Sequence, residues 1–314
     1  MNNVLKEIKE KIGDIPINEE SKELIKKKII ELENNKLNIM ITGATGSGKS
    51  STINSIFNEE VAEVGAGVNP ETMGIKKYKI DNIILWDTPG LGDNPQKDNN
   101  YAKEITELLN RKDSKGKAFI DLVLVVIDGS VRDMKTSFEV INEVILPNMY
   151  DENRILVAIN QCDLAMKGRG WNRELNVPEN SLLKFLDEKC ESVEKRIYES
   201  TGIHVKPIYY SALYHYNISK LLCYIIKSTP DEKRIIYADK LNKDSSVWKN
   251  NDGLHNYVEE IRNDMKGSIM NALDYAAKGA VAGATVGSLI PVIGPVIGAG
   301  IGAVLGFLGG ISGN

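Results

Sequence analysis

The chain has 314 residues, enough for one substantial domain with additional segments. Charged residues make up 26% of the sequence, aromatic residues make up 6%, and the formal net charge of −4 argues against a general nucleic-acid-binding surface. The cysteines Cys162, Cys190 and Cys223 show no paired or metal-ligating spacing, which argues against a disulfide framework or a zinc site and suits the cytoplasm.

The N-terminal residues 1–36 predict two amphipathic helices. Apolar residues recur at helical spacing over residues 3–12 and 19–35, and the sequence Gly-Asp-Ile-Pro at 13–16 separates the two runs. Because charged residues interrupt the first run, we expect no signal peptide. We expect 1–36 to form a helical segment that packs against the domain that follows.

A glycine-rich loop follows the first predicted strand. The apolar run over residues 37–41 leads into Gly43-Ala44-Thr45-Gly46-Ser47-Gly48-Lys49-Ser50, which fits the phosphate-binding pattern G-x-x-x-x-G-K-[ST]. Glycines let backbone N–H groups close around a phosphate, and the helix that begins at Lys49 directs its positive N-terminal end at the same anion. Lys49 can reach the β- and γ-phosphates of a nucleotide, and the Ser50 hydroxyl can hold Mg²⁺. We therefore expect the phosphates to be bound by Gly43, Thr45, Gly46, Ser47, Gly48, Lys49, Ser50 and Ser51.

A candidate switch loop follows the P-loop helix. Residues 59–71 show no clear period and contain Gly65, Gly67 and Pro70, so we expect a loop there. A switch loop in a nucleotide hydrolase supplies a hydroxyl to Mg²⁺ and a backbone N–H to the γ-phosphate. Thr72 is the candidate for both contacts, and the alternative is an ordinary surface threonine.

A second motif ends a predicted pair of strands over residues 75–80 and 82–86. It reads Asp87-Thr88-Pro89-Gly90. A carboxylate at this strand end is placed to hold Mg²⁺ through water, and the Gly90 N–H can meet the γ-phosphate. We assign catalysis to Lys49, Thr72, Asp87 and Gly90, and the metal to Ser50, Thr72 and Asp87.

Further strands and helices alternate along residues 101–227. The near-continuous apolar run over 119–127 is typical of a parallel strand buried on both faces. We expect further strands over 154–159 and 206–210, and helices over 101–110, 134–144 and 218–227. This alternation predicts an α/β fold with a doubly wound, mostly parallel sheet, and such sheets bind ligands at the carboxyl ends of their strands.

The order of motifs over residues 37–229 resembles the Era-like GTPases of the translation-factor class. In that family an Asn-Lys-x-Asp motif reads guanine, and here Asn160-Gln161-Cys162-Asp163 stands in its place. The resemblance implies that Asp163 accepts from guanine N1–H and the exocyclic amine. It also implies that the loop at Ser211 and Ala212 reads the guanine carbonyl through a backbone N–H. It further implies GTP and GDP with Mg²⁺ as ligands, and hydrolysis of GTP to GDP and phosphate.

Two narrower resemblances concern shorter stretches. Residues 166–172, with Pro178, Arg196 and the pairs at 185–186, 192–193 and 201–202, are similar to a bacterial subgroup of Era-like GTPases. The WDTPGLGD sequence at 86–93 also resembles the immunity-related GTPases of animals, which carry helical segments on both sides of the nucleotide domain.

Three residues depart from the pattern of related GTPases. Gln161 replaces the lysine, Leu91 stands where a water-orienting glutamine is found, and Gly46 replaces the asparagine of potassium-dependent relatives. We therefore expect slow hydrolysis without an activating partner. Arg132 and Arg169 are candidate transition-state donors, with surface arginines as the alternative.

The last 36 residues, 279–314, contain no charged side chain. Glycines recur every four residues over 279–287 and again over 294–310, and Pro291 and Pro295 separate the two runs. This spacing is typical of glycine-zipper helices that pack closely in membranes. Each arm is shorter than a full membrane span, so we expect a shallow or re-entrant hairpin after a helical linker over 230–278.

Three coverings of this hairpin remain open: lipid, another copy of the chain, or the protein's own helices. Our first hypothesis is a cytoplasmic GTP-hydrolysing switch whose hairpin associates with the inner face of the cell membrane or self-assembles into a homo-oligomer. The second is a soluble GTPase that assembles the ribosome or another complex, although the net charge weighs against RNA. The third is a GTP-triggered effector that damages membranes. We expect no DNA partner.

Overall fold

The computed structural model describes residues 3–14, 17–57, 62–63, 74–90, 95–131, 134–149, 151–238, 240–249, 251, 255–278, 294–295, 297 and 301. Several features predicted above lie outside these residues. They are most of the 59–71 loop, Thr72, Leu91, Arg132 and most of the 279–314 hairpin.

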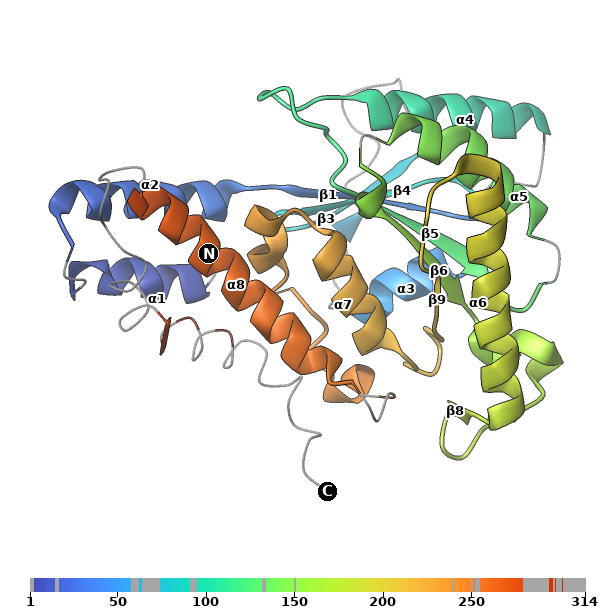
Figure 1. Cartoon of the computed structure of the whole chain (residues 1–314). Helices are drawn as coiled ribbons and strands as arrows, with labels where there is room; N and C mark the ends of the chain where they lie inside the picture. Colours follow the sequence, from blue (N-terminus) through green and yellow to red (C-terminus); the bar gives the residue numbers. More distant parts are fainter. Residues whose placement is uncertain are drawn as a thin grey trace.

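A seven-stranded sheet forms the centre of the molecule, in the order β2-β3-β4-β1-β5-β6-β9 (Figure 1). The strand β1 pairs in parallel with β4 and β5, and β5-β6 and β6-β9 are also parallel, whereas β3 pairs antiparallel with β2 and β4. The strands are β1 (Leu37–Thr42), β2 (Ala62–Glu63), β3 (Lys76–Ile80), β4 (Ile83–Asp87), β5 (Leu122–Asp128), β6 (Ile155–Asn160) and β9 (Ile208–Tyr209). The expected α/β fold with a mostly parallel sheet is confirmed.

Helices cover both faces of this sheet (Figure 1). On one face lie α3 (Lys49–Ile56) and α7 (Ile218–Ser228), and on the other lie α4 (Pro95–Asn110), α5 (Lys135–Glu139) and α6 (Asn180–Thr201). Side chains of β1 alternate between the two sides, so that Ile39 and Ile41 belong to one core cluster and Met40 to the other. Burial on both faces explains why β1, β5 and β6 are almost entirely apolar.

Short helical turns and a small hairpin connect the longer helices and strands. The predicted helix over 134–144 is formed by α5 and a π-helix, η2 (Val140–Ile145). The hairpin consists of β7 (Trp171–Asn172) and β8 (Val177–Pro178). The 3₁₀ turns are η1 (Ile12–Asp14), η3 (Leu146–Asn148), η4 (Glu152–Arg154), η5 (Cys162–Gly168), η6 (Asp231–Tyr237) and η7 (Ser245–Trp248).

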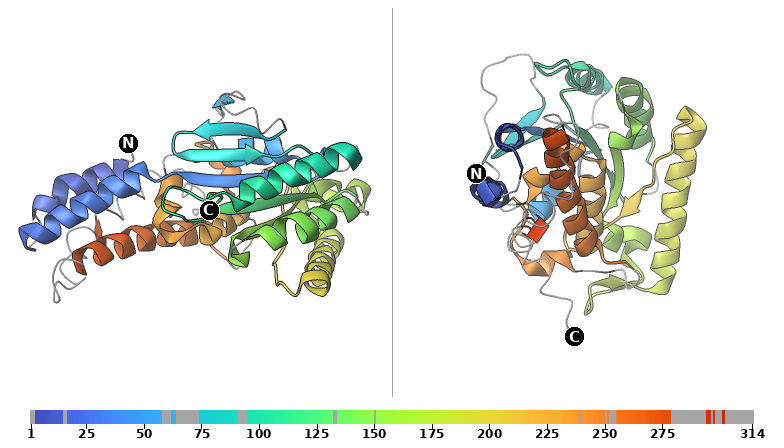
Figure 2. Two further views of the ribbon diagram at one scale, coloured as in Figure 1. Left: turned by 90° about the horizontal axis from the view of Figure 1, so that it is seen from above. Right: turned by 60° about the vertical axis from the view of Figure 1, so that its left-hand side comes forward.

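The N- and C-terminal helices lie side by side at one end of the molecule (Figure 2). They are α1 (Asn3–Lys11), α2 (Glu19–Asn34) and α8 (Tyr257–Lys278). Asn18 begins α2 as its N-cap, because its side chain accepts a hydrogen bond of 2.8 Å from the Ser21 N–H. Apolar residues of all three helices belong to the same core cluster as α3, α7 and one face of the sheet.

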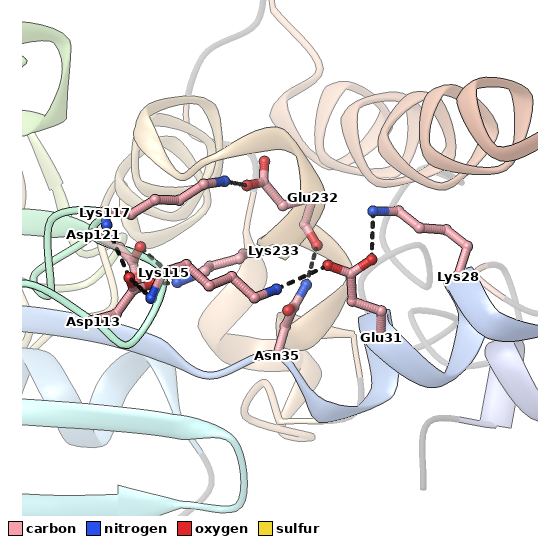
Figure 3. Close-up of polar contacts among 9 residues, drawn as sticks. All are labelled: Lys28, Glu31, Asn35, Asp113, Lys115, Lys117, Asp121, Glu232 and Lys233. Atoms are coloured by element: carbon pink, nitrogen blue, oxygen red, sulfur yellow. Dashed lines mark hydrogen bonds and ion pairs between the residues drawn. The ribbon is translucent and has the colours of Figure 1, made fainter. Parts of the chain in front are cut away.

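A cluster of polar contacts joins α2 and η6 to the residues that precede β5, and we call it the polar junction (Figure 3). Its centre is Asp121, whose two carboxylate oxygens each accept a hydrogen bond of 2.7 Å from Lys233 Nζ. Asp121 Oδ2 also accepts a hydrogen bond of 2.8 Å from the Asn38 N–H. Burial raises the pKa of this carboxyl group, while the Lys233 charge acts in the opposite direction.

The loop between α4 and β5 supplies the outer contacts of the polar junction. Lys115 forms an ion pair of 3.1 Å with Glu31 of α2, and Lys117 forms one of 3.4 Å with Glu232 of η6 (Figure 3). These pairs are largely exposed and contribute little individually. The buried Asp121–Lys233 pair is therefore the main polar tie at this end of the sheet.

Two described residues of the C-terminal segment contribute to the core. Ile297 and Ile301 are helical, have exposed fractions of 0% and 2%, and belong to the cluster shared by the terminal helices. Within the part of the chain that the structure describes, no helix is both long and apolar enough to cross a membrane. The glycines of the run at 279–287, and those from 298 to 310, lie outside the described residues.

Candidate nucleotide-binding site

The P-loop begins where β1 ends, at the carboxyl edge of the sheet. Three of its glycines have positive φ values, of 148° at Gly43, 79° at Gly46 and 86° at Gly48. A Cβ atom at Gly43 would lie 2.1 Å from the Val126 carbonyl oxygen, and one at Gly48 would lie 2.2 Å from Asn160 Nδ2. The loop therefore needs glycine both for its backbone conformation and for its close packing.

The lysine of the P-loop extends back over the loop itself. Lys49 Nζ donates hydrogen bonds of 3.1 Å to the Gly43 carbonyl and 3.2 Å to the Ala44 carbonyl. Ser50 and Thr45 are exposed beside it, whereas Ser47 is buried. A phosphate on this loop would meet the lysine charge, the exposed hydroxyls and the first N–H groups of α3.

Asp87 ends β4 and lies opposite Ile41 in the register with β1. It is 9% exposed, and its Oδ1 atom has no hydrogen-bond partner among the described residues. Burial raises the pKa of this carboxyl group, and the nearby Lys49 charge opposes the rise. A buried carboxylate oxygen without a partner, together with the exposed Ser50 hydroxyl, fits the oxygen ligands that Mg²⁺ requires.

Gly90 packs directly on the P-loop. A Cβ atom there would lie 2.1 Å from Thr45 Oγ1 and 2.6 Å from the Thr45 backbone nitrogen. The structure thus brings the Asp87–Gly90 motif against the phosphate-binding loop, as the sequence predicts. Thr72, the third expected metal ligand, lies outside the described residues.

Asn160 connects three motifs at the other end of the site. Its Nδ2 donates a hydrogen bond of 2.9 Å to the Ser47 carbonyl, and its Oδ1 accepts one of 3.0 Å from the Ala212 N–H. Ser211 is fully buried beside it. Asn160 therefore ties the P-loop to the 211–212 loop, and the Ala212 N–H is already engaged within the protein.

Gln161 occupies the position where related GTPases carry lysine. It has a positive φ of 58°, and its Nε2 donates a hydrogen bond of 2.6 Å to the Gly46 carbonyl. This amide holds residues 160–163 against the P-loop.

Asp163 lies in η5, directly after β6. The side chain is 4% exposed, and its Oδ1 atom lacks a hydrogen-bond partner within the described ranges. An unpaired buried acceptor costs free energy, so this oxygen favours a ligand that brings N–H donors. The guanine edge is such a ligand.

Trp171 anchors the small hairpin and does not point to a ligand role. Its ring packs at centroid distances of 5.4 Å from Tyr214 and 5.5 Å from Tyr216. It therefore joins the hairpin to the 211–216 loop. The same cluster contains Cys162, Ala165, Leu182 and Leu186. Arg169 is exposed at the edge of this cluster.

Sequence reasoning missed the polar ties beneath the site. The Tyr210 hydroxyl lies 2.6 Å from Thr52 Oγ1, and Ser55 Oγ donates a hydrogen bond of 3.1 Å to the Ala212 carbonyl. These contacts fix α3 to Tyr210 and to the 211–212 loop. No pattern in the sequence indicates these contacts.

Three comparisons bear on this site. The model of the family described as Interferon-inducible GTPase (IIGP) matches residues 1–108, which run from α1 through the Asp87–Gly90 motif to α4. Interferon-inducible GTPase 1 of Mus musculus is 41% identical over 81 residues, which are 24% of this chain and 20% of that protein. GTPase Der of Rickettsia prowazekii is 25% identical over 211 residues, 66% of this chain and 42% of its own length.

The chain is homologous to P-loop GTPases. The predicted resemblance to immunity-related and to Era-like bacterial GTPases is thereby confirmed. A solved structure of a variant of Aquifex aeolicus Era bound to GDP·AlF₄⁻ is 21% identical, with a TM-score of 0.37, and the match covers 62% of this chain and 56% of that one. The chain spans between a fifth and about two fifths of the length of the curated relatives named above.

Proposed function

We propose that this chain binds GTP and GDP with Mg²⁺ and hydrolyses GTP as a molecular switch. The observation that carries the proposal is a pair of buried carboxylate oxygens without partners among the described residues, on Asp87 and Asp163. They lie in motifs that pack on the same P-loop, Asp87 through Gly90 and Asp163 through Asn160 and Gln161. One is suited to a hydrated metal and the other to the N–H groups of guanine.

Different residues of the chain are proposed to contact the phosphates and the metal during hydrolysis. Lys49 and the P-loop N–H groups stabilise the negative charge that the β- and γ-phosphates carry, and the Gly90 N–H contacts the γ-phosphate. Ser50 and Asp87 would hold Mg²⁺, with Thr72 proposed as a further ligand. The metal would neutralise charge on the transferred phosphoryl group.

Slow turnover follows from the residue after Gly90. Leu91 has no polar atom with which to orient an attacking water, so we propose that an activating partner supplies this function. A turnover near the typical enzyme value of about 10 s⁻¹ in dilute monomer would contradict the proposal.

We also propose that residues 279–314 associate with the inner face of a cell membrane or with another copy of the chain. The support is a segment of 36 residues without charge and with glycines every four positions. Burial of Ile297 and Ile301 favours internal packing at those two positions. Ribosome assembly and a membrane-damaging activity triggered by GTP stay as alternative hypotheses.

The decisive experiment compares nucleotides and membranes with one protein preparation. Calorimetric titration with GDP, ADP and XDP should show preference for GDP in the wild type, and Lys49→Ala should abolish binding. Equal affinity for ADP and GDP would refute the guanine assignment. Flotation of the full chain with liposomes tests the lipid proposal, and sedimentation with ribosomes tests its alternative.

A further inference from the structure

A lysine lies in the middle of the apolar face of α6. The buried positions of this helix are Leu182, Leu186, Lys189, Val193 and Ile197, which follow the spacing of a single helical stripe. The two leucines belong to the cluster around Trp171, and Val193 and Ile197 belong to the core under α6. Packing alone would favour leucine or methionine at position 189.

The ammonium group of Lys189 contacts the loop that follows β5. Nζ donates hydrogen bonds of 2.6 Å to the Gly129 carbonyl and 2.8 Å to the Val131 carbonyl. The side chain is 9% exposed, and burial lowers its pKa, which the Asp128 charge partly offsets. A buried charge costs free energy unless it is well bonded. A lysine at this position therefore stabilises the core less than an apolar residue of similar size would.

The loop that Lys189 holds lies directly against the base-reading motif. The Gly129 N–H donates a hydrogen bond of 2.7 Å to the Asn160 carbonyl. A Cβ atom at Gly129 would lie 2.5 Å from that oxygen and 3.2 Å from the Gln161 carbonyl. Gly129 is therefore bonded on one side to α6 and on the other side to the residues that precede Asp163.

We propose that Lys189 is a positioning residue, which holds the 129–131 loop against Asn160 and Gln161 so that Asp163 is set to read a guanine base. This inference rests on the proposed guanine specificity. The apolar stripe of α6 fixes the helix, and the ammonium group fixes the loop. Without the ammonium group the 129–131 loop should move, and Asp163 should lose its fixed orientation. The P-loop should be unaffected, because its hydrogen bonds to Lys49 do not involve Lys189.

The test measures base discrimination, which a simple loss of stability would not change. GDP and IDP differ only in the exocyclic amine that Asp163 is expected to bind. In Lys189→Met the ratio of the IDP to the GDP dissociation constant should fall by about tenfold, which corresponds to about 1.4 kcal/mol. Lys195→Met, on the exposed side of the same helix, should keep the wild-type ratio.

A second variant tests the same loop without touching the lysine. Gly129→Ala should push the loop away from Asn160 and lower the ratio in the same direction. Gly267→Ala, where a Cβ atom meets nothing within 4 Å, is its control. If Lys189→Met does not fold, Gly129→Ala decides the question.

The outcomes separate the two proposals. A folded Lys189→Met with the wild-type ratio and only a lower melting temperature would overturn the positioning role. A wild-type ratio in Gly129→Ala would overturn it as well. A wild-type protein without preference for GDP over ADP would instead overturn the proposed function on which the inference depends.

Discussion

Substituting Ile297 or Ile301 by alanine tests whether the uncharged C-terminal segment is part of the folded core in solution. Both side chains are almost fully buried, with exposed fractions of 0% and 2%. Replacing a buried isoleucine by alanine costs about 2–5 kcal/mol, because apolar contacts are lost and a cavity remains. Ile30→Ala on α2 is the matched control, since that isoleucine is 45% exposed and should cost much less.

The assay is urea unfolding of the full chain, followed by circular dichroism. With a urea slope of about 3 kcal/mol per M, a loss of about 3 kcal/mol lowers the midpoint by roughly 1 M. Ile297 and Ile301 are four residues apart, so their effects should not be strictly additive. Urea midpoints equal to that of the wild type in both variants would refute the packing of this segment in the core. If these variants then also floated less with liposomes than the wild type, the two side chains would contact lipid instead.

Three further predictions concern charged side chains. Asp163→Asn should shift nucleotide preference from GDP toward XDP in a competition titration, because an amide donor suits the extra carbonyl of xanthine; unchanged preference would exclude Asp163 as the reader. Burial raises the pKa of Asp87, so the ionised carboxylate destabilises the nucleotide-free protein at pH values above that pKa. Asp87→Asn should therefore raise the melting temperature of the nucleotide-free protein at neutral pH. The same variant should lose Mg²⁺-dependent nucleotide binding. Lys233→Met leaves Asp121 buried and unpaired and should cost about 3–5 kcal/mol; the double variant with Asp121→Asn should recover part of this loss in urea unfolding, and strictly additive losses would contradict the pairing.

The candidate phosphate-binding loop could be located in the sequence because its pattern is local. Gly43 to Ser50 forms one continuous pattern, and the apolar runs of β1, β5 and β6 reflect burial on both faces of a parallel sheet. Asp87 was singled out because it ends the apolar strand β4, whereas Asp163 was singled out by the resemblance of residues 160–163 to a known motif. In the P-loop and in these strands, the local sequence pattern and the tertiary fold require the same residue types.

The remaining features depend on contacts between distant parts of the chain. Asp121 and Lys233 are 112 residues apart, and their pairing depends on how η6 lies against the residues before β5. No helix over 180–201 was predicted from the sequence, and the partners of Lys189 in α6 are backbone carbonyls that no side-chain pattern reveals. The burial of Ile297 and Ile301 likewise could not be deduced from glycine spacing, which suits lipid and protein surroundings equally well.

The shared core of the terminal helices has a consequence for how the chain folds during synthesis. The helices α1 and α2 are synthesised before the sheet, yet α8, which packs on α2 and shares the core cluster of both helices, is synthesised only after all strands of the sheet. An amphipathic helix without its tertiary partner is only marginally stable in water. The helices α1 and α2 should therefore stay exposed to chaperones and proteases until α8 has been synthesised. A nascent chain arrested before α8 should be cleaved within residues 3–34 by a protease that leaves the released protein intact.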